Sequence, residues 1–217
     1  MQRIAALLAL SLLATPVLAA WRDIPYDDLA RIPLLLQKLD QGGIYRSWVE
    51  ARPGSGHAGL PADLQVELQV DGRAIPVPRR ADGTLDLPWR ADWSGKEAKL
   101  RLNHPKERVG IVFHLKPRTP SGTRMSYAKL TESLPLMERG IREMAGMMSF
   151  LAPEPEALAL QFAPAGAQTL VLTRPGKAPR TFRSTADGKL ELPWNPDWNA
   201  ATVVLSAPLK SVDPVID

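Results

Sequence analysis

The sequence of 217 residues contains no cysteine and only three histidines. Without cysteine there can be no disulfide scaffold, no catalytic thiolate and no zinc site with thiolate ligands. His57, His104 and His114 also lack the mutual spacing of a metal site. Beyond residue 20, no apolar run approaches the roughly 18 residues that a membrane-spanning helix needs. We therefore expect no metal or other cofactor and no transmembrane span in the mature chain.

Several catalytic signatures are absent as well. The sequence has no Gly-x-Ser-x-Gly elbow, no His-Glu-x-x-His helix and no phosphate-binding glycine loop. Residues 52–57 are rich in glycine, but they lack the lysine, the preceding apolar strand and the following helix that phosphate binding requires. These absences predict a protein that is not an enzyme.

The overall composition is that of a soluble globular protein. Hydrophobic residues make up 45% and charged residues 23% of the chain, which argues against disorder. The 21 prolines and 15 glycines argue against an uninterrupted long-helix protein. The length suffices for one large domain or two small ones with a real core.

The N-terminus has the pattern of an export signal. Arg3 precedes an apolar stretch over residues 4–13, and Val17-Leu18-Ala19 gives a small-residue cleavage site. We predict a signal peptide over residues 1–19, cleaved near Ala19, and a periplasmic mature protein. An uncleaved anchor is the alternative interpretation, whereas a lipid-anchored lipoprotein would need a cysteine after the apolar stretch.

Positive charge is concentrated in the middle of the chain. Residues 99–124 contain seven basic residues and a single acidic one, in a chain of net charge +4. A solvated strand face and linker is the simpler interpretation. The functional alternative is a binding patch for an anionic envelope component or an envelope protein, formed by Lys106, Arg108, Lys116 and Arg118. Nucleic acid is not an expected partner, because the segment lacks interleaved aromatic residues.

One segment occurs twice. Residues 81–93 and residues 186–198 are identical at nine of thirteen positions, 105 residues apart. A weaker similarity links the tyrosine-led segments that begin at Tyr26 and Tyr127. The pattern predicts a tandem duplication, with a first module over residues 20–118 and a second over 119–217. Pro117, Pro120 and Gly122 mark the join.

Each module reads as a helix followed by strands. In the second copy we expect Ser133 to cap a helix that has Pro135 in its first turn. An apolar stripe follows at helical spacing, at Leu134, Met137, Ile141, Met144 and Met148. The corresponding run of the first copy is residues 29–39, which ends before Gly42-Gly43.

The remainder of each module alternates with the period of a strand. Val66, Leu68 and Val70 would point inward, and the Asp-Gly pairs at 82–83 and 187–188 predict tight turns. The predicted fold is α+β and mainly β: a tandem duplication of a small antiparallel β-sandwich-like module, each led by one helix. A single merged sheet remains an alternative.

Paired tryptophans close each repeated element, Trp89 with Trp93 and Trp194 with Trp198. Indole faces can stack on a sugar ring or an acyl chain, so all four are candidate ligand-binding residues. Because both copies need the same core, we favour a packing role for them. Exposure of one indole in each pair would favour binding.

Methionines cluster in the second half and suggest a different site. Thioether ligands suit Cu(I), and an exported protein could carry this ion. The clustered residues are Met125, Met137, Met144, Met147 and Met148. The first copy has leucines in the matching region, which indicates that these positions need bulk rather than sulfur.

The export signal, the element Ala-Asp-Gly-x-Leu-x-Leu-Pro-Trp at residues 81–89 and 186–194, and the tyrosine-led openings resemble a family of exported Gram-negative proteins. That family is catalogued as a domain of unknown function, number 2987, so the resemblance implies export and architecture but no activity. We expect a non-catalytic periplasmic protein that binds or scaffolds an envelope component. The alternatives are a cell-wall polysaccharide hydrolase, using carboxylates between the modules, and a methionine-rich copper binder.

Overall fold

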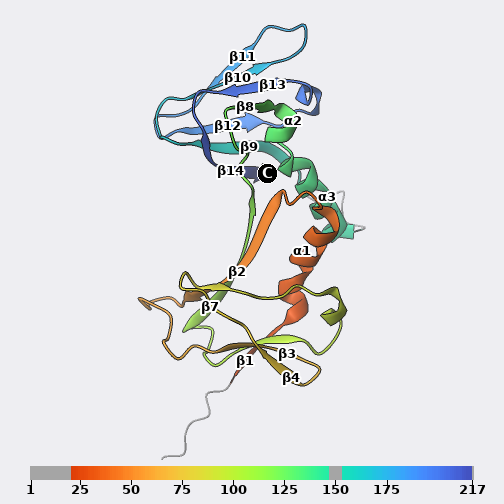
Figure 1. The fold of residues 1–217 in the computed structure, drawn as a ribbon, viewed down its shortest axis with the longest axis vertical. Helices are drawn as coiled ribbons and strands as arrows, with labels where there is room; N and C mark the ends of the chain where they lie inside the picture. The colour runs from red at the N-terminus through yellow and green to blue at the C-terminus, as the bar shows by residue number, and fades with distance from the viewer. Residues whose placement is uncertain (1–20, 147–152, 217) are drawn as a thin grey trace, which may run out of the picture.

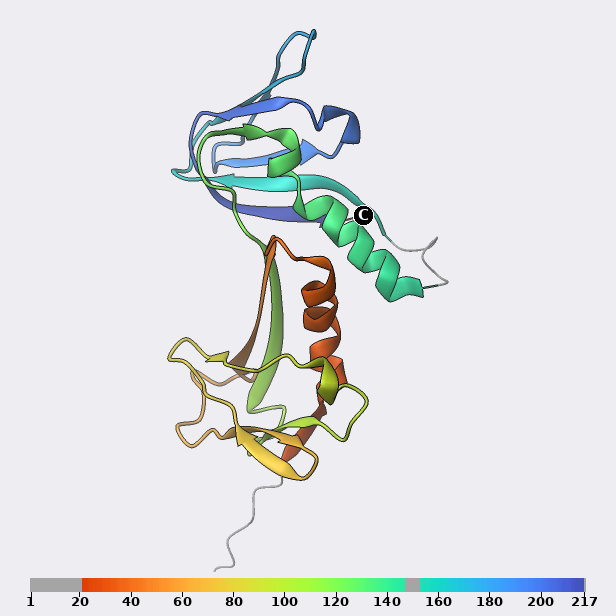
Figure 2. The ribbon, with the colours of Figure 1, turned by 45° about the vertical axis from the view of Figure 1, so that its right-hand side comes forward.

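A computed structural model describes residues 21–146 and 153–216. The predicted signal peptide, Met147 and Met148 lie outside the described residues. The described chain forms two halves that are stacked along its longest axis, with helices α1 and α3 where they meet (Figure 1, Figure 2).

The first half begins with a strand and a long helix and continues with strands. Its elements are β1 (Arg22–Pro25), α1 (Tyr26–Leu39), β2 (Tyr45–Pro53), β3 (Val66–Val70), β4 (Arg73–Pro76), β5 (Thr84–Leu85), the short helix η1 (Ala91–Trp93), β6 (Lys99–Leu102) and β7 (Val109–Pro117).

The second half runs in a similar order. Its elements are β8 (Arg124–Ser126), α2 (Tyr127–Leu130), α3 (Ser133–Ala145), β9 (Pro155–Phe162), β10 (Thr169–Thr173), β11 (Arg180–Arg183), β12 (Lys189–Pro193), the short helix η3 (Pro196–Trp198), β13 (Thr202–Leu205) and β14 (Leu209–Ile216).

Each half contains two antiparallel sheets with the same strand arrangement. In the first half the strand orders are β1-β6-β3-β4 and β5-β2-β7; in the second they are β8-β13-β10-β11 and β12-β9-β14. Every described strand pairs only with strands of its own half, so the structure has no merged sheet among these residues. The expectation of a mainly β fold with several antiparallel sheets is confirmed.

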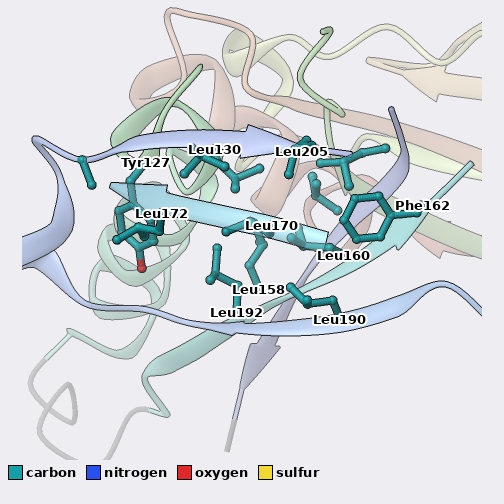
Figure 3. Close-up of a cluster of buried hydrophobic side chains, with 14 of the residues drawn as sticks. Tyr127, Leu130, Leu158, Leu160, Phe162, Leu170, Leu172, Leu190, Leu192 and Leu205 are labelled. Carbon is teal, nitrogen blue, oxygen red and sulfur yellow. The ribbon is translucent and has the colours of Figure 1, made fainter. Parts of the chain in front are cut away.

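The two sheets of each half enclose one hydrophobic core. In the first half, Leu68 of β3 and Leu100 of β6 pack with Val49 of β2. In the second half, leucines from β9, β10, β12 and β13 meet in the same way (Figure 3). The predicted alternation is confirmed at Val66, Leu68 and Val70, which are all buried. Burial of alternate residues from both sheets is the packing of a β-sandwich.

The two Asp-Gly turns form as predicted. Gly83 has φ +91° and Gly188 has φ +79°, a region that side-chain-bearing residues rarely adopt. At Gly83 a Cβ atom would also lie 2.7 Å from the Ala51 carbonyl oxygen. Glycine is therefore required there for two reasons.

The helices of the second half differ from the prediction. Instead of one helix there are two, and the cap of the first is Ser126, whose Oγ accepts a hydrogen bond from the Lys129 N–H at 3.1 Å. Ser133 is the first residue of α3 and not its cap, so that prediction was wrong. The residue at the cap position, Glu132, lies two residues after the end of α2 and has helical backbone angles, whereas a capping residue needs a non-helical backbone.

Polar and apolar contacts join the two halves where α1 and α3 meet. The Tyr45 hydroxyl donates a buried hydrogen bond to the Ser133 carbonyl at 2.9 Å, and Lys38 forms an ion pair with Glu143. Beside these contacts lies a small apolar cavity of about 130 Å³, lined mainly by α1 and α3. Among the described residues, no helix is both long enough and apolar enough to span a bilayer.

Candidate functional site

The first repeated element is organised around a buried tyrosine. The Tyr26 hydroxyl accepts a hydrogen bond from the Arg90 N–H at 2.7 Å and lies 3.1 Å from the Pro88 carbonyl, to which it donates. The Trp93 indole meets the Tyr26 ring edge to face, with 5.8 Å between ring centroids. Trp89 packs on the same ring from another side.

The second element repeats this arrangement. The Tyr127 hydroxyl donates to the Pro193 carbonyl at 2.6 Å and accepts from the Asn195 N–H at 2.9 Å. Trp198 meets Tyr127 edge to face at 5.6 Å and is only 6% exposed. Burial to this degree assigns Trp198 to the core.

The other three candidate tryptophans are half-buried. Trp93 and Trp194 pack against the cores of their own halves, and the Arg90 guanidinium covers the Trp93 ring at 5.1 Å. Trp89 also packs on its core, but it additionally lines a cleft. Trp89 is therefore the candidate tryptophan that lies closest to a possible ligand site.

This cleft opens where β5 separates from β2. The two strands are paired only at Val49 with Leu85 and at Glu50 with Thr84. Beyond that point a cavity of about 510 Å³ lies between them, within the usual range for ligand pockets. One wall is residues 46–49 of β2, and the other includes Leu87 and Trp89. We call this cavity the β2 cleft.

At the same place in the second half the strands stay paired, and the cavity of about 480 Å³ found there lies over the sheet and not between two strands. Two equivalent hydrogen bonds fix the correspondence: the Ala51 N–H donates to Gly83, and the Phe162 N–H donates to Gly188, both at 2.9 Å. From there β12 stays paired with β9 along its whole length, with Leu192 opposite Leu158. Counting back from the shared hydrogen bond places Ser47 where the second half has Leu158.

Side-chain substitutions accompany this opening. Leu158 is fully buried in the second core, whereas the corresponding Ser47 lines the cleft. Ala157 and Ala159 flank Leu158, while Arg46 and Trp48 flank Ser47. Because serine leaves most of the leucine volume empty, the first half has room at this wall that the second half lacks.

A group of cations lies beside the β2 cleft. Arg46 of β2 is directly opposite Lys116 of β7, and Arg118 is two residues further along the same face. All three side chains are exposed, and none forms an ion pair with any carboxylate of residues 21–146 or 153–216. We call Arg46, Lys116 and Arg118 the cation cluster.

The predicted basic patch is divided by strand β7. Lys106 and Arg108 precede this strand, whereas Lys116 is near its end. Arg108 and Lys116 are therefore about 26 Å apart along the strand, at roughly 3.3 Å per residue. Arg108 contacts the His57 ring. Lys116 and Arg118 thus lie near Arg46, across β2 from the cleft, and Lys106 and Arg108 do not.

An aromatic and ionic row adjoins the cation cluster. The Trp48 and His114 rings stack with centroids 4.7 Å apart and planes 10° from parallel. His114 Nε2 is 2.8 Å from Glu50 Oε2, and Arg52 Nε is 3.0 Å from Glu50 Oε1. Hydrogen bonding to Arg52, and secondarily to His114, holds the pKa of Glu50 below its ordinary value. The charge of Glu50 is thus compensated by Arg52 rather than by the cation cluster.

The carboxylates of the β2 cleft are also engaged. Arg80 and Asp86 form an ion pair with a shortest distance of 2.7 Å. Asp82 accepts a hydrogen bond from the Thr84 N–H at 2.9 Å, and the pKa of Asp82 is lowered mainly by this bond. A general acid for glycoside hydrolysis needs a raised pKa, so Asp82 is suited to hydrogen bonding and not to proton donation.

The described methionines lie in separate environments. Met125 packs against the core of the second half, while Met137 and Met144 line the apolar cavity between α1 and α3. Within the described ranges, no group of three or more histidine, aspartate or glutamate side chains is placed to hold a metal ion.

Sequence reasoning missed Arg46, Ser47 and Trp48. The sequence alone provides no fixed point for aligning them, because residue 45 precedes Gly83 by 38 positions whereas residue 156 precedes Gly188 by 32. The hydrogen bonds of Ala51 and Phe162 are what set residues 45–53 against 156–164. That alignment puts Ser47 opposite a leucine, and a polar residue at a core position of one copy is a sign of divergence.

The fold and the site define an α+β, mainly β protein with an open cleft in its first half. Residues 64–162 match the model of a family described as a protein of unknown function, DUF2987. This match confirms, over residues 64–162, the resemblance noted in the sequence. The curated proteins and the solved structures contain no match.

Proposed function

We propose that this protein is a non-catalytic binding protein of the bacterial envelope, which holds an anionic component at the β2 cleft. The observation that carries the proposal is the cation cluster, in which Arg46 lines the cleft and Lys116 lies directly opposite Arg46 on β7. Export to the periplasm rests on the N-terminal pattern of Arg3, the apolar stretch and Ala19.

The electrostatic argument starts from the cross-strand pair. Like charges directly opposite each other in an antiparallel pair destabilise the sheet. Arg46 and Lys116 keep this arrangement although Glu50 lies on the same face. A bound anion would compensate both charges, and the neighbouring Trp48 offers an apolar surface to the same ligand. The pair therefore fits a binding role better than a purely structural one.

We further propose that the two halves arose by tandem duplication, as the repeat at residues 81–93 and 186–198 suggests. The common strand arrangement and the matching tyrosine contacts support this origin. On this view the second half keeps a closed sheet, and the first half has diverged into a binding module.

The cleft gives less support to a polysaccharide hydrolase. That function would place two facing carboxylates between the halves, whereas the carboxylates of the β2 cleft, Asp82 and Asp86, belong to the first half. Both are engaged by neighbouring groups of the protein. A copper carrier is likewise less favoured, because Met125 packs in a different place from Met137 and Met144.

The test is co-sedimentation of the purified protein with isolated Gram-negative cell envelopes. A triple variant, Arg46→Gln, Lys116→Gln and Arg118→Gln, removes the cation cluster. We expect it to lose most of the envelope association seen for the wild type at low salt, and added salt to weaken the wild type likewise.

The matched control carries Arg73→Gln, Lys106→Gln and Arg108→Gln, which remove the same charge far from the cleft. This control should sediment like the wild type. Equal binding by all three proteins, or equal losses in both variants, would refute the proposed site.

A further inference from the structure

Strand β2 presents unpaired backbone groups to the cleft. Even-numbered residues of β2 bond to β7: the Arg118 N–H donates to Ile44, and the Gly54 N–H donates to Arg108. Because bonding direction alternates along an antiparallel strand, the N–H and C=O of Ser47 point away from β7, toward the cleft. No hydrogen bond joins them to another described residue.

The opposite wall carries matching groups. The N–H and C=O of Leu87 and the N–H of Trp89 have no hydrogen-bond partner among the described residues. In the second half the corresponding groups are bonded: Leu192 is paired with Leu158, and the Trp194 N–H donates to the Glu156 carbonyl at 2.7 Å. The β2 cleft is therefore a gap in a hydrogen-bonded ladder, with donors and acceptors on both sides.

The side chains around the gap indicate which kind of chain segment would fit into it. Toward the interior, Ser47, Val49 and Leu87 leave room for an apolar side chain. Toward solvent, Arg46 and Lys116 present positive charge. An extended chain places successive side chains on opposite faces, so one apolar and one acidic side chain in alternation would meet both environments.

We propose that the β2 cleft receives an extended acidic peptide segment of a partner protein, which adds to the edge of β2 as a strand. The proposal rests on the proposed function and names the class of its ligand. The occupant takes the place that β12 has beside β9 in the second half, where a strand of alternating residues, Lys189–Pro193, closes the sheet. Its backbone bonds to Ser47, and its acidic side chains face the cation cluster.

Backbone complementarity favours a peptide over an anionic glycan. The groups offered by Ser47 and Leu87 have strand spacing and include both donors and acceptors, which is the pattern that another polypeptide backbone satisfies. A glycan could use Arg46 and Trp48, but it would not need an unpaired main chain on both walls. Binding of an anionic glycan is therefore the alternative outcome that the test distinguishes.

The probe is a fluorescent hexapeptide of alternating glutamate and leucine, measured against the full protein by anisotropy. The matched controls are two versions of the same peptide, each methylated at one of the two alternating sets of backbone nitrogens. Methylation keeps the charge and the side chains but removes those hydrogen-bond donors. We expect the parent to bind, and one methylated version to bind at least about tenfold more weakly. An oligogalacturonate of similar charge provides the glycan arm.

A second measurement locates the bonds. Hydrogen exchange followed by NMR should show slower exchange of the Ser47, Leu87 and Trp89 amides when the peptide is added. The Trp194 amide, already bonded to Glu156, should exchange slowly with and without peptide.

A variant closes the site without removing charge. Ser47→Leu introduces the residue found in the second half, and we expect it to abolish peptide binding while leaving the fold intact. Ser55→Leu, in an exposed loop, is the control and should bind normally.

The outcomes separate this inference from the proposed function. Equal affinity of parent and methylated peptides, unchanged amide exchange, or binding of the oligogalacturonate alone would overturn the peptide assignment while envelope association could still hold. If the wild-type protein bound neither the peptide nor the envelopes, the site as a whole would be overturned.

Discussion

The Tyr127 hydroxyl donates a hydrogen bond of 2.6 Å to the carbonyl of Pro193, 66 residues further along the chain. The same hydroxyl accepts from the Asn195 N–H, so it satisfies two backbone groups at the end of β12. Burial raises the pKa of Tyr127. The hydroxyl therefore remains a protonated donor at neutral pH.

Removing this hydroxyl is expected to destabilise the second half. Tyr127→Phe leaves the Pro193 carbonyl and the Asn195 N–H without their partner, at a cost of about 1–3 kcal/mol. Urea unfolding followed by far-ultraviolet circular dichroism measures the change. Tyr26→Phe removes the equivalent contacts of the first half and should have a similar effect. Wild-type stability in both variants would show that these bonds are energetically unimportant.

The two tryptophans that contact the tyrosine rings should differ in their contribution to stability. Trp198 is 6% exposed, and its truncation to alanine is expected to cost about 3–5 kcal/mol in unfolding free energy. Trp93 is half-buried, so Trp93→Ala should cost clearly less. Chemical denaturation of both variants gives the comparison. An equal or reversed order would contradict the assignment of Trp198 to the core.

Replacing one cation of the cross-strand pair should improve stability and weaken binding. Lys116→Glu places opposite charges on facing residues with Arg46, which is expected to stabilise the protein by roughly 0.2–1 kcal/mol. The same change should reduce envelope association. Lys106→Glu, in the turn before β7, serves as the control and should affect neither property. Thermal unfolding measures the change in stability, and co-sedimentation measures the change in envelope association.

Acid should weaken the row formed by Arg52, Glu50 and His114. The pKa of Glu50 lies below its ordinary value of 4.5, because hydrogen bonds from Arg52 and then His114 favour the carboxylate. A lowered carboxyl pKa stabilises the folded state above that ordinary value, and the contribution is lost as the pH falls through the lowered pKa.

The corresponding variant is Glu50→Gln. Between about pH 5 and about pH 2 its unfolding free energy should fall less steeply than that of the wild type. Glu97→Gln removes an exposed carboxylate that forms no ion pair with another described residue, and should keep the wild-type slope. Parallel urea titrations at several pH values measure the slopes, and identical slopes for all three proteins would count against the role of Glu50.

Local features of the fold could be predicted from the sequence, because they depend on neighbouring residues. The turns at Gly83 and Gly188 follow from the need for positive φ, and the buried positions of β3 follow from its alternation. The break between α2 and α3 was missed, because Ser126 caps a single turn that the apolar periodicity of the following helix does not reveal.

Features that depend on distant pairing could not be read in the same way. Strand β2 pairs with β7 from Tyr45, opposite Pro117, to Pro53, opposite Val109. This register brings Arg46 beside Lys116, yet the two residues are 70 positions apart, so the basic segment alone predicted two of the three residues of the cation cluster. A register shift of one residue would have sent Arg46 to the interior face.

The unpaired groups of Ser47 are recessed between two walls, and this has a consequence for self-association. An open sheet edge usually invites edge-to-edge joining with another folded sheet, which leads to aggregates. Here a single thin chain can enter the gap, but a second intact copy cannot bring its own edge against Ser47, because residues 85–89 stand in the way. The protein can thus expose unpaired strand groups without joining edge to edge with a second copy.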